Sequence, residues 1–374
     1  MANESRLSMV IDDDGRLFGV VNVIDALVIL LVAAVLIAGA VFIFGIGDET
    51  DTRYVTVDLG PQPEYTAQQI TAGDEWGSDF TVTDVYMSPA GANDDGDVNV
   101  LIKAAVNGTV IDQEATAPAP ISFTGEPLRF GRLLEIETNE WAAEGTVIDI
   151  EETGPDIDTT TEQLVLQADV DAETARAISP GDEYRVGETN LLTIESVTVY
   201  RTGDTNERTV VIGASAQTRF DRGTQLLGDQ TITVGSSLSV ETRSYAFDGR
   251  IINTGSLEEP GSPTTVSATI DLGVMSEERA NRLAVGMTET TGGVVTAEIV
   301  DIEDQPYEEV VLTGSGYETF EHPTDREVTI TIEISTRELD DGTLRFRGHT
   351  IEVGDDISLR FAGIPVDGEV QSLA

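Results

Sequence analysis

The most regular hydrophobic pattern is an uncharged stretch near the start of the chain. No charged residue occurs from Ala26 to Gly47, and Ala26–Phe44 alone would extend about 28 Å as a helix, close to the thickness of a bilayer core. This pattern predicts a transmembrane helix over residues 22–47. A cleaved secretory peptide is the alternative, but its apolar core is usually shorter, about 7 to 15 residues.

Residues just before the apolar stretch have the spacing of a helix start. Asn22 and Asp25 suit an N-cap and an acidic residue in the first turn, so we expect the helix to begin near Val23. Ala34 and Ala38 form a pair of small residues that would let a second helix approach closely. Small residues are also ordinary in membrane helices, so dimerisation through this pair is only one interpretation.

Positive charges near the apolar stretch set the expected orientation. Arg6 and Arg16 precede it and Arg53 follows it, a bias that favours the N-terminus inside. We therefore expect residues 1–21 to be a cytoplasmic tail and the rest of the chain to be extracellular. Asn107-Gly-Thr109 is a glycosylation sequon that would be usable there, although a three-residue match also arises by chance.

Beyond the apolar stretch, the pattern changes to alternating polar and apolar positions. The clearest runs are Val98–Val106, Thr209–Ala216 and Val328–Ser335. Alternation with a period of two predicts strands with one buried face.

These alternating runs recur at a shift slightly above 100 residues. Each unit opens with a strand ending in an acid, at Asp58, Asp169 and Asp271, and continues with a short helix-like stretch and a glycine turn. The helix-like stretch is clearest at Ala172–Ile178 and Ser276–Leu283. The turns are Ala72-Gly-Asp-Glu75, Pro180-Gly-Asp-Glu183 and Val285-Gly-Met-Thr288.

Two further glycines, separated by 14 residues, recur later in each unit. They are Gly131 with Gly145, Gly235 with Gly249, and Gly354 with Gly368. A glycine just before an alternating strand supplies a turn or bulge that a side chain would obstruct.

The pattern therefore predicts a mainly β fold with short helices (α+β), in three tandem repeats. We expect about five or six strands and one short helix per unit, which a small barrel-like or sandwich-like unit would bury. The predicted repeats are residues 54–153, 164–255 and 264–374. Polar, turn-rich segments at Thr153–Thr161 and Gly255–Pro263 separate them.

The composition of the chain indicates the solvent conditions in which this fold is expected to be soluble. The chain has 68 acidic and 21 basic residues, a formal net charge of -47, and Lys103 as its single lysine. Such a surface is expected of a protein from a halophile, because the Debye length in molar salt is only about 3 Å and repulsion between the acidic side chains is screened. A hydrophobic content of 40% argues against a disordered acidic chain. The acidic balance also argues against binding nucleic acid or anionic lipid headgroups.

Candidate catalytic chemistry is sparse. The chain has no cysteine, which excludes disulfides and thiolate nucleophiles. His322 and His349 are the two histidines, and neither has a partner at metal-binding spacing, so we interpret both as solvated or packed. No nucleophile elbow, phosphate loop or dinucleotide fingerprint occurs. We therefore expect a non-enzymatic protein without catalytic, cofactor-binding or metal-binding residues.

Two other features leave alternatives open. Asn93–Asp97 could gather carboxylates around calcium, but it lacks the spacing of a calcium loop. The equivalent segments Thr202–Thr205 and Glu303–Pro306, and the similar Glu338–Gly342, favour polar hairpin turns instead.

Aromatic residues of the first unit offer a further signal, because the second and third units contain no tryptophan. Such residues either pack in a core or contact a partner. Those considered are Trp76, Tyr86, Phe123 and Trp141.

The segment Asp14-Gly-Arg-Leu-Phe-Gly19, followed by Asn22-Val-Ile-Asp-Ala-Leu-Val-Ile-Leu30, resembles the start of a membrane-anchored family known as domain of unknown function 4330 (DUF4330). The paired-glycine pattern resembles that family's soluble part, more weakly in all three units. Family members usually carry one such unit, so this chain resembles a haloarchaeal member with three copies. A looser likeness, in architecture, is to mammalian-cell-entry (MCE-type) lipid-transfer barrels.

These observations together predict a scaffold or interaction protein of the haloarchaeal cell envelope. It would cross the cell membrane once and bind an envelope protein or its own copies, without cofactor or nucleic acid. The alternative, implied by the looser likeness, is an MCE-like oligomeric carrier or accessory protein for lipid or other hydrophobic cargo.

Overall fold

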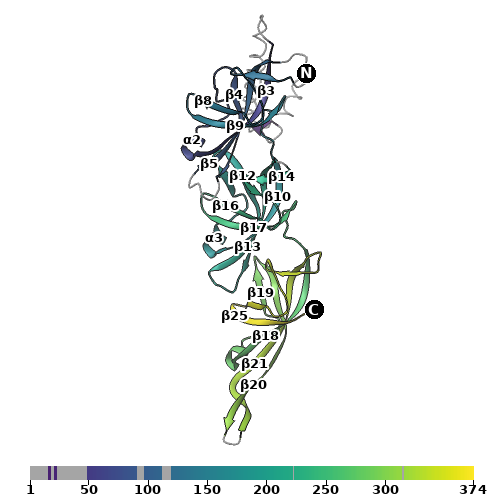
Figure 1. Cartoon of the computed structure of the whole chain (residues 1–374). Helices are drawn as coiled ribbons and strands as arrows, with labels where there is room; N and C mark the ends of the chain where they lie inside the picture. The colour runs from purple at the N-terminus through teal and green to yellow at the C-terminus, as the bar shows by residue number, and fades with distance from the viewer. Residues whose placement is uncertain are drawn as a thin grey trace, which may run out of the picture. The chain divides into compact units, whose positions relative to one another are not determined.

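The computed structural model describes residues 16–17, 21–22, 49–90, 97–111, 119–221, 223–313 and 316–374. Strands dominate the part so described, and they form three large antiparallel sheets, two of which curl into half-barrels. The prediction of a mainly β chain with few short helices is confirmed (Figure 1).

The N-terminal part contributes only a small hairpin to this description. Strands β1 (Arg16–Leu17) and β2 (Val21–Asn22) pair antiparallel. Asn22, the expected N-cap, is therefore a strand residue, and the rest of the predicted helix over residues 22–47 lies outside the described residues. Among the helices that are described, none is long and apolar enough to cross a membrane.

The first large sheet has the order β7-β6-β5-β3-β9-β8, and β4 pairs with β5. The sequon residue Asn107 lies within β5. The strands are β3 (Thr50–Pro63), β4 (Phe80–Pro89), β5 (Asp97–Val110), β6 (Ile121–Phe123), β7 (Glu126–Pro127), β8 (Leu133–Glu137) and β9 (Ala142–Glu151).

The second and third sheets share one topology. Their strand orders are β11-β12-β13-β10-β17-β16 and β19-β20-β21-β18-β25-β24. The second sheet contains β10 (Thr160–Asp171), β11 (Glu183–Val186), β12 (Thr189–Arg201), β13 (Glu207–Asp221), β14 (Thr224–Leu227), β15 (Gln230–Thr231), β16 (Ser237–Glu241) and β17 (Ala246–Thr254). The third contains β18 (Ser262–Ser276), β19 (Thr288–Thr291), β20 (Val294–Thr313), β21 (Gly316–Glu338), β22 (Leu344–Phe346), β23 (His349–Thr350), β24 (Asp356–Phe361) and β25 (Ile364–Leu373).

A short helix follows the first strand of each sheet. The helices are α2 (Glu64–Ala67), α3 (Ala172–Ala177) and α4 (Glu277–Ala280). Asp171 caps α3 by accepting hydrogen bonds from the Glu173 and Thr174 amides at 2.8 and 2.9 Å. The predicted stretch Ala172–Ile178 thus forms α3 almost in full, whereas only the four residues Glu277–Ala280 of the stretch Ser276–Leu283 form α4.

The recurring glycine turns adopt one hydrogen-bonded geometry twice in each unit. In every case the turn glycine has positive φ and donates to a carbonyl of a following strand, whose own amide donates back to the residue after the glycine. The first set pairs Gly73 with Val82, Gly181 with Ile194, and Gly286 with Ile299; the second pairs Gly131 with Val147, Gly235 with Ile251, and Gly354 with Val370.

The second glycine of each pair lies inside a strand, beside a register shift with the opening strand. A Cβ at Gly145 would lie 2.5 Å from Val57 Cγ1, and one at Gly368 would lie 2.5 Å from the Asp271 carbonyl oxygen. These glycines therefore lie inside strands and not just before them, although a side chain at Gly145 or Gly368 would be obstructed as expected.

Alternation along the strands builds the cores. In β21, Val328, Ile330, Ile332 and Ile334 are all buried, and they face the inner side of the third sheet because successive side chains in a strand alternate faces. Burying each such side chain contributes about 1.5 to 3 kcal/mol.

One predicted turn is wrong. Glu303–Pro306 lies inside β20, which continues to Thr313 before the chain reverses into β21. Proline is tolerated there because the pairing register shifts between Pro306 and Glu308. In Figure 1 this hairpin extends well beyond the other strands of its sheet.

Candidate functional site

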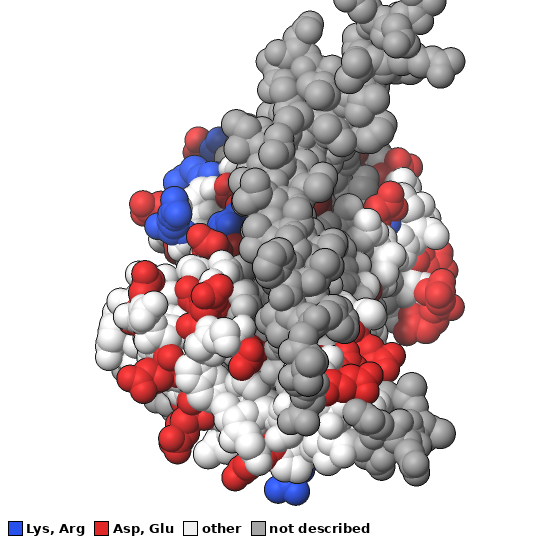
Figure 2. Space-filling model, turned by 90° about the horizontal axis from the view of Figure 1, so that it is seen from above, with Lys and Arg blue, Asp and Glu red and all other residues white. Residues whose placement is uncertain are grey.

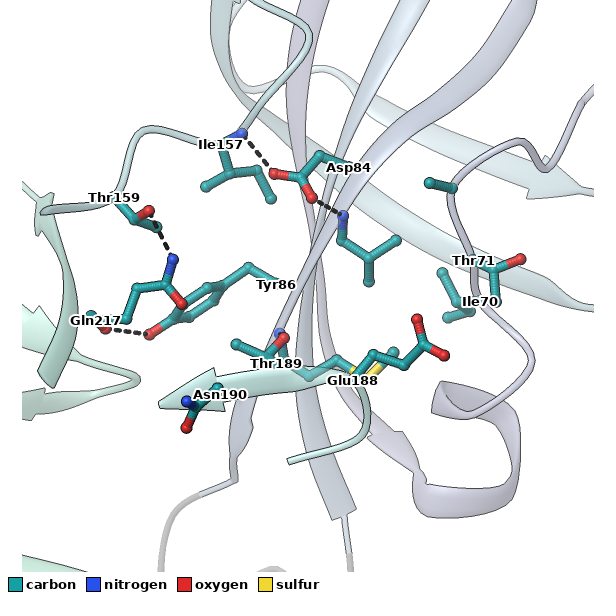
Figure 3. A pocket seen from close by; sticks show the side chains of 13 residues that line it. Ile70, Thr71, Asp84, Tyr86, Ile157, Thr159, Glu188, Thr189, Asn190 and Gln217 are labelled. Atoms are coloured by element: carbon teal, nitrogen blue, oxygen red, sulfur yellow. Dashed lines mark hydrogen bonds between the residues drawn. The ribbon is translucent and has the colours of Figure 1, made fainter. Parts of the chain in front are cut away.

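Side chains of consecutive sheets meet at two junctions, and each junction borders a cavity. At the first junction, Tyr86 in β4 is buried and joins the apolar core of the second sheet together with Leu101. Its hydroxyl accepts the Gly228 amide at 3.1 Å and lies 3.5 Å from the Gln217 carbonyl oxygen, to which it donates (Figure 3). Burial raises the pKa of this phenol.

Asp84, two residues before Tyr86, fixes the segment that connects the first two sheets. Its Oδ2 accepts the Ile157 amide at 2.8 Å, and its Oδ1 accepts the Val85 amide at 2.9 Å. Burial raises the pKa of Asp84, and these hydrogen bonds oppose the shift. The hydroxyl of Thr83 adds a hydrogen bond to the Pro155 carbonyl oxygen at 2.5 Å. The connecting segment is thus tied to β4 by side chains.

The first cavity has a volume of about 430 Å³. Apolar groups of Ile70 and Ile157 line it together with the polar groups of Glu188 and Asn190 (Figure 3). The two sheets approach closely at its border, where a Cβ at Gly187 would collide with the Met87 sulfur. Its lining is mixed, without a nucleophile and base within hydrogen-bonding distance of each other.

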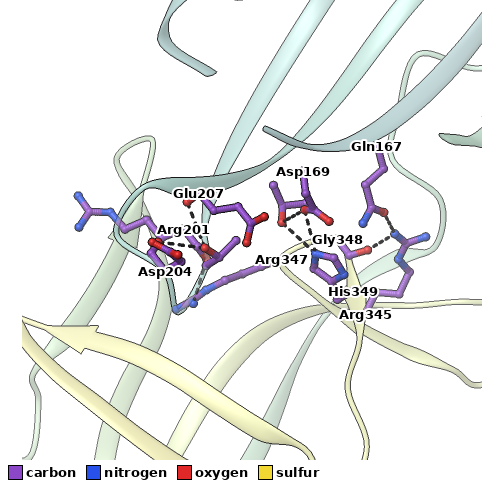
Figure 4. Close-up of polar contacts among 11 residues, drawn as sticks. Gln167, Asp169, Arg201, Asp204, Glu207, Arg345, Arg347, Gly348 and His349 are labelled. Atoms are coloured by element: carbon purple, nitrogen blue, oxygen red, sulfur yellow. Dashed lines mark hydrogen bonds and ion pairs between the residues drawn. The ribbon is translucent and has the colours of Figure 1, made fainter. Parts of the chain in front are cut away.

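At the second junction, three polar side chains form a chain of contacts (Figure 4). The Thr209 hydroxyl donates to Asp169 Oδ1 at 2.6 Å, and His349 Nε2 lies 2.9 Å from the same hydroxyl and 3.6 Å from Asp169 Oδ1. Since the single hydroxyl proton goes to the carboxylate, Nε2 acts as a donor. A histidine that activates a nucleophile must accept that proton instead, so this arrangement joins the two sheets and does not resemble a catalytic triad.

Arg345 and Arg347 complete the second junction. Arg345 donates to Gln167 Oε1 at 2.5 Å and to the Gly348 carbonyl, and burial lowers its pKa. Arg347 is paired with the buried Glu289 and donates to the Arg201 carbonyl oxygen of the second sheet at 3.3 Å.

Arg347 has an unusual electrostatic environment for an arginine. Burial, followed by the repulsion of Arg201, lowers its pKa to about 10. The guanidinium nevertheless remains charged at neutral pH and is compensated by Glu289. Its role is therefore to hold the end of the third sheet against the second.

The second cavity has a volume of about 680 Å³. Cationic groups of Arg250 and Arg345 line it together with the carboxylates of Asp169 and Asp248. The charges are mixed, so the lining does not select a strongly charged ligand.

The residues considered from sequence have the following places. His349 lies at the second junction, whereas His322 Nδ1 accepts the Asp325 amide at 3.1 Å and its ring lies against Tyr307. Glu338–Gly342 forms the expected polar turn, in which Leu339 and Thr343 are hydrogen-bonded. Asn93–Asp97 lies outside the described residues except for Asp97 at the start of β5. Within the described chain, no group of three or more metal-binding side chains could hold an ion.

The aromatic residues of the first unit that were considered from sequence contact other residues of this chain. Trp141 is buried and its indole N–H donates to Asp74 Oδ2 at 2.6 Å. Trp76 makes an edge contact with Phe80 at 5.7 Å between ring centroids, and Phe123 is buried. Sequence reasoning missed the two junction arginines, whose only signal is that they flank Phe346 in Arg-Phe-Arg-Gly348.

Comparison with protein families places the first part of the chain. Residues 9–151 match the model of a family described as Domain of unknown function (DUF4330), and the match ends with the last residue of β9. No curated protein and no solved structure matches the chain. The three similar sheets support repeated units. The chain therefore carries a DUF4330 domain at residues 9–151, followed by two sheets of related architecture.

Proposed function

We propose that this chain is a non-enzymatic scaffold or interaction protein of the cell envelope of a halophile. Residues 22–47 would anchor it in the cell membrane, with residues 1–21 in the cytoplasm. The repeats at 54–153, 164–255 and 264–374, each a small barrel-like or sandwich-like unit, would lie outside and bind an envelope protein.

The observation that carries this proposal is the use of polar side chains at the junctions. Asp84 and Tyr86 at the first junction, and Thr209, Arg345 and His349 at the second, all make hydrogen bonds between consecutive sheets or to their connecting segment. Groups committed to joining sheets are not free to act on a substrate. The outer surface of such a chain is then the part that remains available to bind another protein, as a scaffold requires.

The charge of the surface supports the proposed environment. On the face seen in Figure 2, Asp and Glu side chains are spread widely, while Lys and Arg side chains gather in a few places. A net charge of -47 keeps a protein soluble in concentrated salt, where repulsion between its own charges is screened.

Complementation of a strain lacking the chain tests the scaffold against an enzyme. His349→Gln keeps a side-chain N–H donor for Thr209, whereas His349→Leu removes it. A scaffold requires the junction, so we expect His349→Gln to complement as the wild type does and His349→Leu to complement less well. Equal and complete loss with both variants, while both stay folded by circular dichroism, would contradict the scaffold and favour catalysis.

Protease treatment of intact and lysed cells tests the proposed location. With tags at both ends, we expect the C-terminal tag to be removed from intact cells and the N-terminal tag only after lysis. Protection of both tags in intact cells would refute the extracellular placement of the repeats.

A second candidate is the oligomeric carrier for lipid or other hydrophobic cargo. It is favoured by exposed apolar side chains near the end of the β20–β21 hairpin, among them Leu312 and Tyr317. Native mass spectrometry of detergent-extracted protein separates the two candidates. A closed ring with bound lipid would support the carrier and contradict the scaffold, and a lipid-free monomer or dimer would do the reverse.

A further inference from the structure

The β20–β21 hairpin contains an extension that the fold does not need. The pairs Ile194 with Ala214 and Ile299 with Ile332 occupy equivalent positions in the second and third sheets, because each immediately precedes the register shift of its hairpin. From these pairs the two ladders correspond as far as Arg201 with Arg208 and Pro306 with Arg326. Residues 202–207 then close the hairpin in the second sheet, and residues 307–325 take their place in the third. Because the second sheet folds with the short turn, the extension in the third has another use.

One face of the extension is apolar and open to solvent. Leu312 pairs with Tyr317 and Val310 pairs with Thr319, so their side chains share a face. Val310, Leu312 and Tyr317 are exposed by 62%, 70% and 79%. We call Val310, Leu312, Tyr317 and Thr319 the tip face. Clustered exposed apolar side chains of this kind mark an interaction surface.

The extension is also a two-stranded ribbon for most of its length. Among the described strands, β19 pairs with β20 only as far as Glu298, and β18 pairs with β21 only from Asp325 onward. An isolated two-stranded ribbon is marginally stable in water. Covering the tip face would therefore stabilise the ribbon as well as remove apolar surface from water.

Charges on the same face indicate what can cover it. Glu308 pairs with Glu321, and both are exposed on the tip-face side at the base of the ribbon. These carboxylates oppose deep insertion into a bilayer, since moving a charge into an apolar medium is costly. A second copy of the same ribbon, packed antiparallel on the first, avoids repulsion between these carboxylates. A twofold axis near Val310 places the glutamates of the two copies at opposite ends of the contact.

We propose that the tip face binds the tip face of a second copy of this chain. Three side chains supply on the order of 300 Å² per copy, less than the roughly 800 Å² per partner of a typical stable interface. The contact is therefore weak between free chains. Tethering in one membrane, which rests on the proposed anchor, raises the effective concentration and makes the contact productive.

Cysteine cross-linking tests this contact directly, because the chain has no cysteine of its own. In full-length protein at molar salt, Leu312→Cys should form a disulfide between chains under mild oxidation at least fivefold faster than Glu318→Cys. Glu318 lies in the same ribbon on the opposite face, opposite Val311. Adding Tyr317→Ser to Leu312→Cys should abolish that preference. Equal rates for the two single-cysteine variants, or no cross-link with either, would overturn the proposal.

The same variants separate this proposal from the proposed anchor and from a lipid partner. If the chain is not anchored, Leu312→Cys still cross-links faster than Glu318→Cys. The cross-linking rate then rises with protein concentration to the same extent in samples with and without vesicles. Phosphatidylcholine vesicles provide the lipid probe. If they protect the Leu312→Cys thiol from a water-soluble maleimide and no cross-link forms, lipid covers the tip face and the proposal is refuted.

Discussion

Lys103 is buried in β5, and its ammonium group pairs with Glu151 at the end of β9. The same ammonium donates to Thr56 Oγ1 in the intervening strand β3 at 3.2 Å and lies 3.9 Å from Asp149 Oδ2. The only lysine of the chain thus joins three neighbouring strands. The pair is asymmetric, because the side chain of Lys103 is 2% exposed and that of Glu151 is 33% exposed.

This asymmetry predicts unequal costs for the two halves of the pair. Glu151→Leu leaves a buried ammonium with the Thr56 hydroxyl and the more distant Asp149 carboxylate. Breaking a buried pair in this way costs about 3 to 5 kcal/mol. Lys103→Met leaves carboxylates that water reaches and fills nearly the same volume, so we expect less than about 1.5 kcal/mol. Unfolding followed by tryptophan fluorescence measures both, since Trp76 and Trp141 are the only tryptophans and both lie close to this sheet.

Lys103→Ala serves as the control for packing, because it removes the charge and leaves a cavity. We expect it to cost about 2 to 5 kcal/mol, more than Lys103→Met. If Lys103→Met proved as costly as Glu151→Leu, the buried charge would not be the source of the asymmetry.

The in-strand glycines predict a graded series of alanine substitutions. A Cβ at Gly368 would meet the Asp271 backbone oxygen at 2.5 Å, one at Gly145 would meet the Val57 side chain at 2.5 Å, and one at Gly249 would have its nearest contact, with Leu166, at 3.2 Å. A backbone oxygen cannot move away from an added Cβ as readily as a side chain can. We expect Gly368→Ala and Gly145→Ala each to lower the free energy of unfolding by about 1 to 3 kcal/mol, with Gly368→Ala the more costly of the two. Gly249→Ala should cost less than about 1 kcal/mol.

Thermal unfolding by circular dichroism ranks the three variants. The reverse order, with Gly249→Ala the most destabilising, would show that the close approach of the strands is not what selects glycine. Gly255→Ala provides a comparison without crowding, because its Cβ would meet nothing within 4 Å, although its φ of +76° still imposes backbone strain.

Tyr86→Phe tests the first junction by removing a single oxygen atom. The substitution keeps the ring in the shared core and removes the acceptor of the Gly228 amide. A buried donor left without a partner costs about 1 to 3 kcal/mol. We expect faster hydrogen exchange at the Gly228 amide, with no change at the Gly286 amide, which is bonded within the third sheet. Unchanged exchange at Gly228 would refute the role of the hydroxyl.

The repeat pattern could be predicted from sequence because its signals are local. Alternation at Thr209–Ala216 and Val328–Ser335 predicted strands that the structure contains as parts of β13 and β21. Glycine turns were likewise visible, since positive φ leaves a direct mark on residue choice. The extent of the β20–β21 hairpin was not, because Glu303–Pro306 has the composition of a turn and the register shift that accommodates Pro306 depends on β21.

The junctions could not be predicted for a different reason. Thr209 and His349 are 140 positions apart and meet only because two separate sheets pack together. Nothing in either local sequence specifies that meeting. Arg347 shows the same limit, because its burial beside Glu289 depends on strands β19 and β22 coming together in the folded sheet.

Tyr184 predicts how stability changes at alkaline pH. Burial, followed by the charge of Glu241, raises the pKa of Tyr184 from 10.0 to about 12. The folded chain therefore keeps the phenol proton in a range where the unfolded chain has lost it. By linkage, this contribution is present in full below pH 10 and is lost as the pH rises from about 10 to about 12. Burial also raises the pKa values of Tyr200 and Tyr245, so other phenols act in the same direction.

Denaturant unfolding at a series of pH values measures this dependence. Tyr184→Phe removes one of the titrating groups, so we expect the loss of stability between pH 10 and 12 to become smaller, without disappearing, because Tyr200 and Tyr245 remain. Tyr65→Phe is the matched control, because it removes a phenol that is 72% exposed in the folded chain. An equal slope in the wild type and Tyr184→Phe would mean that the folded state does not protect this phenol, and that the hydrophobic contacts around Tyr184 open before it ionises.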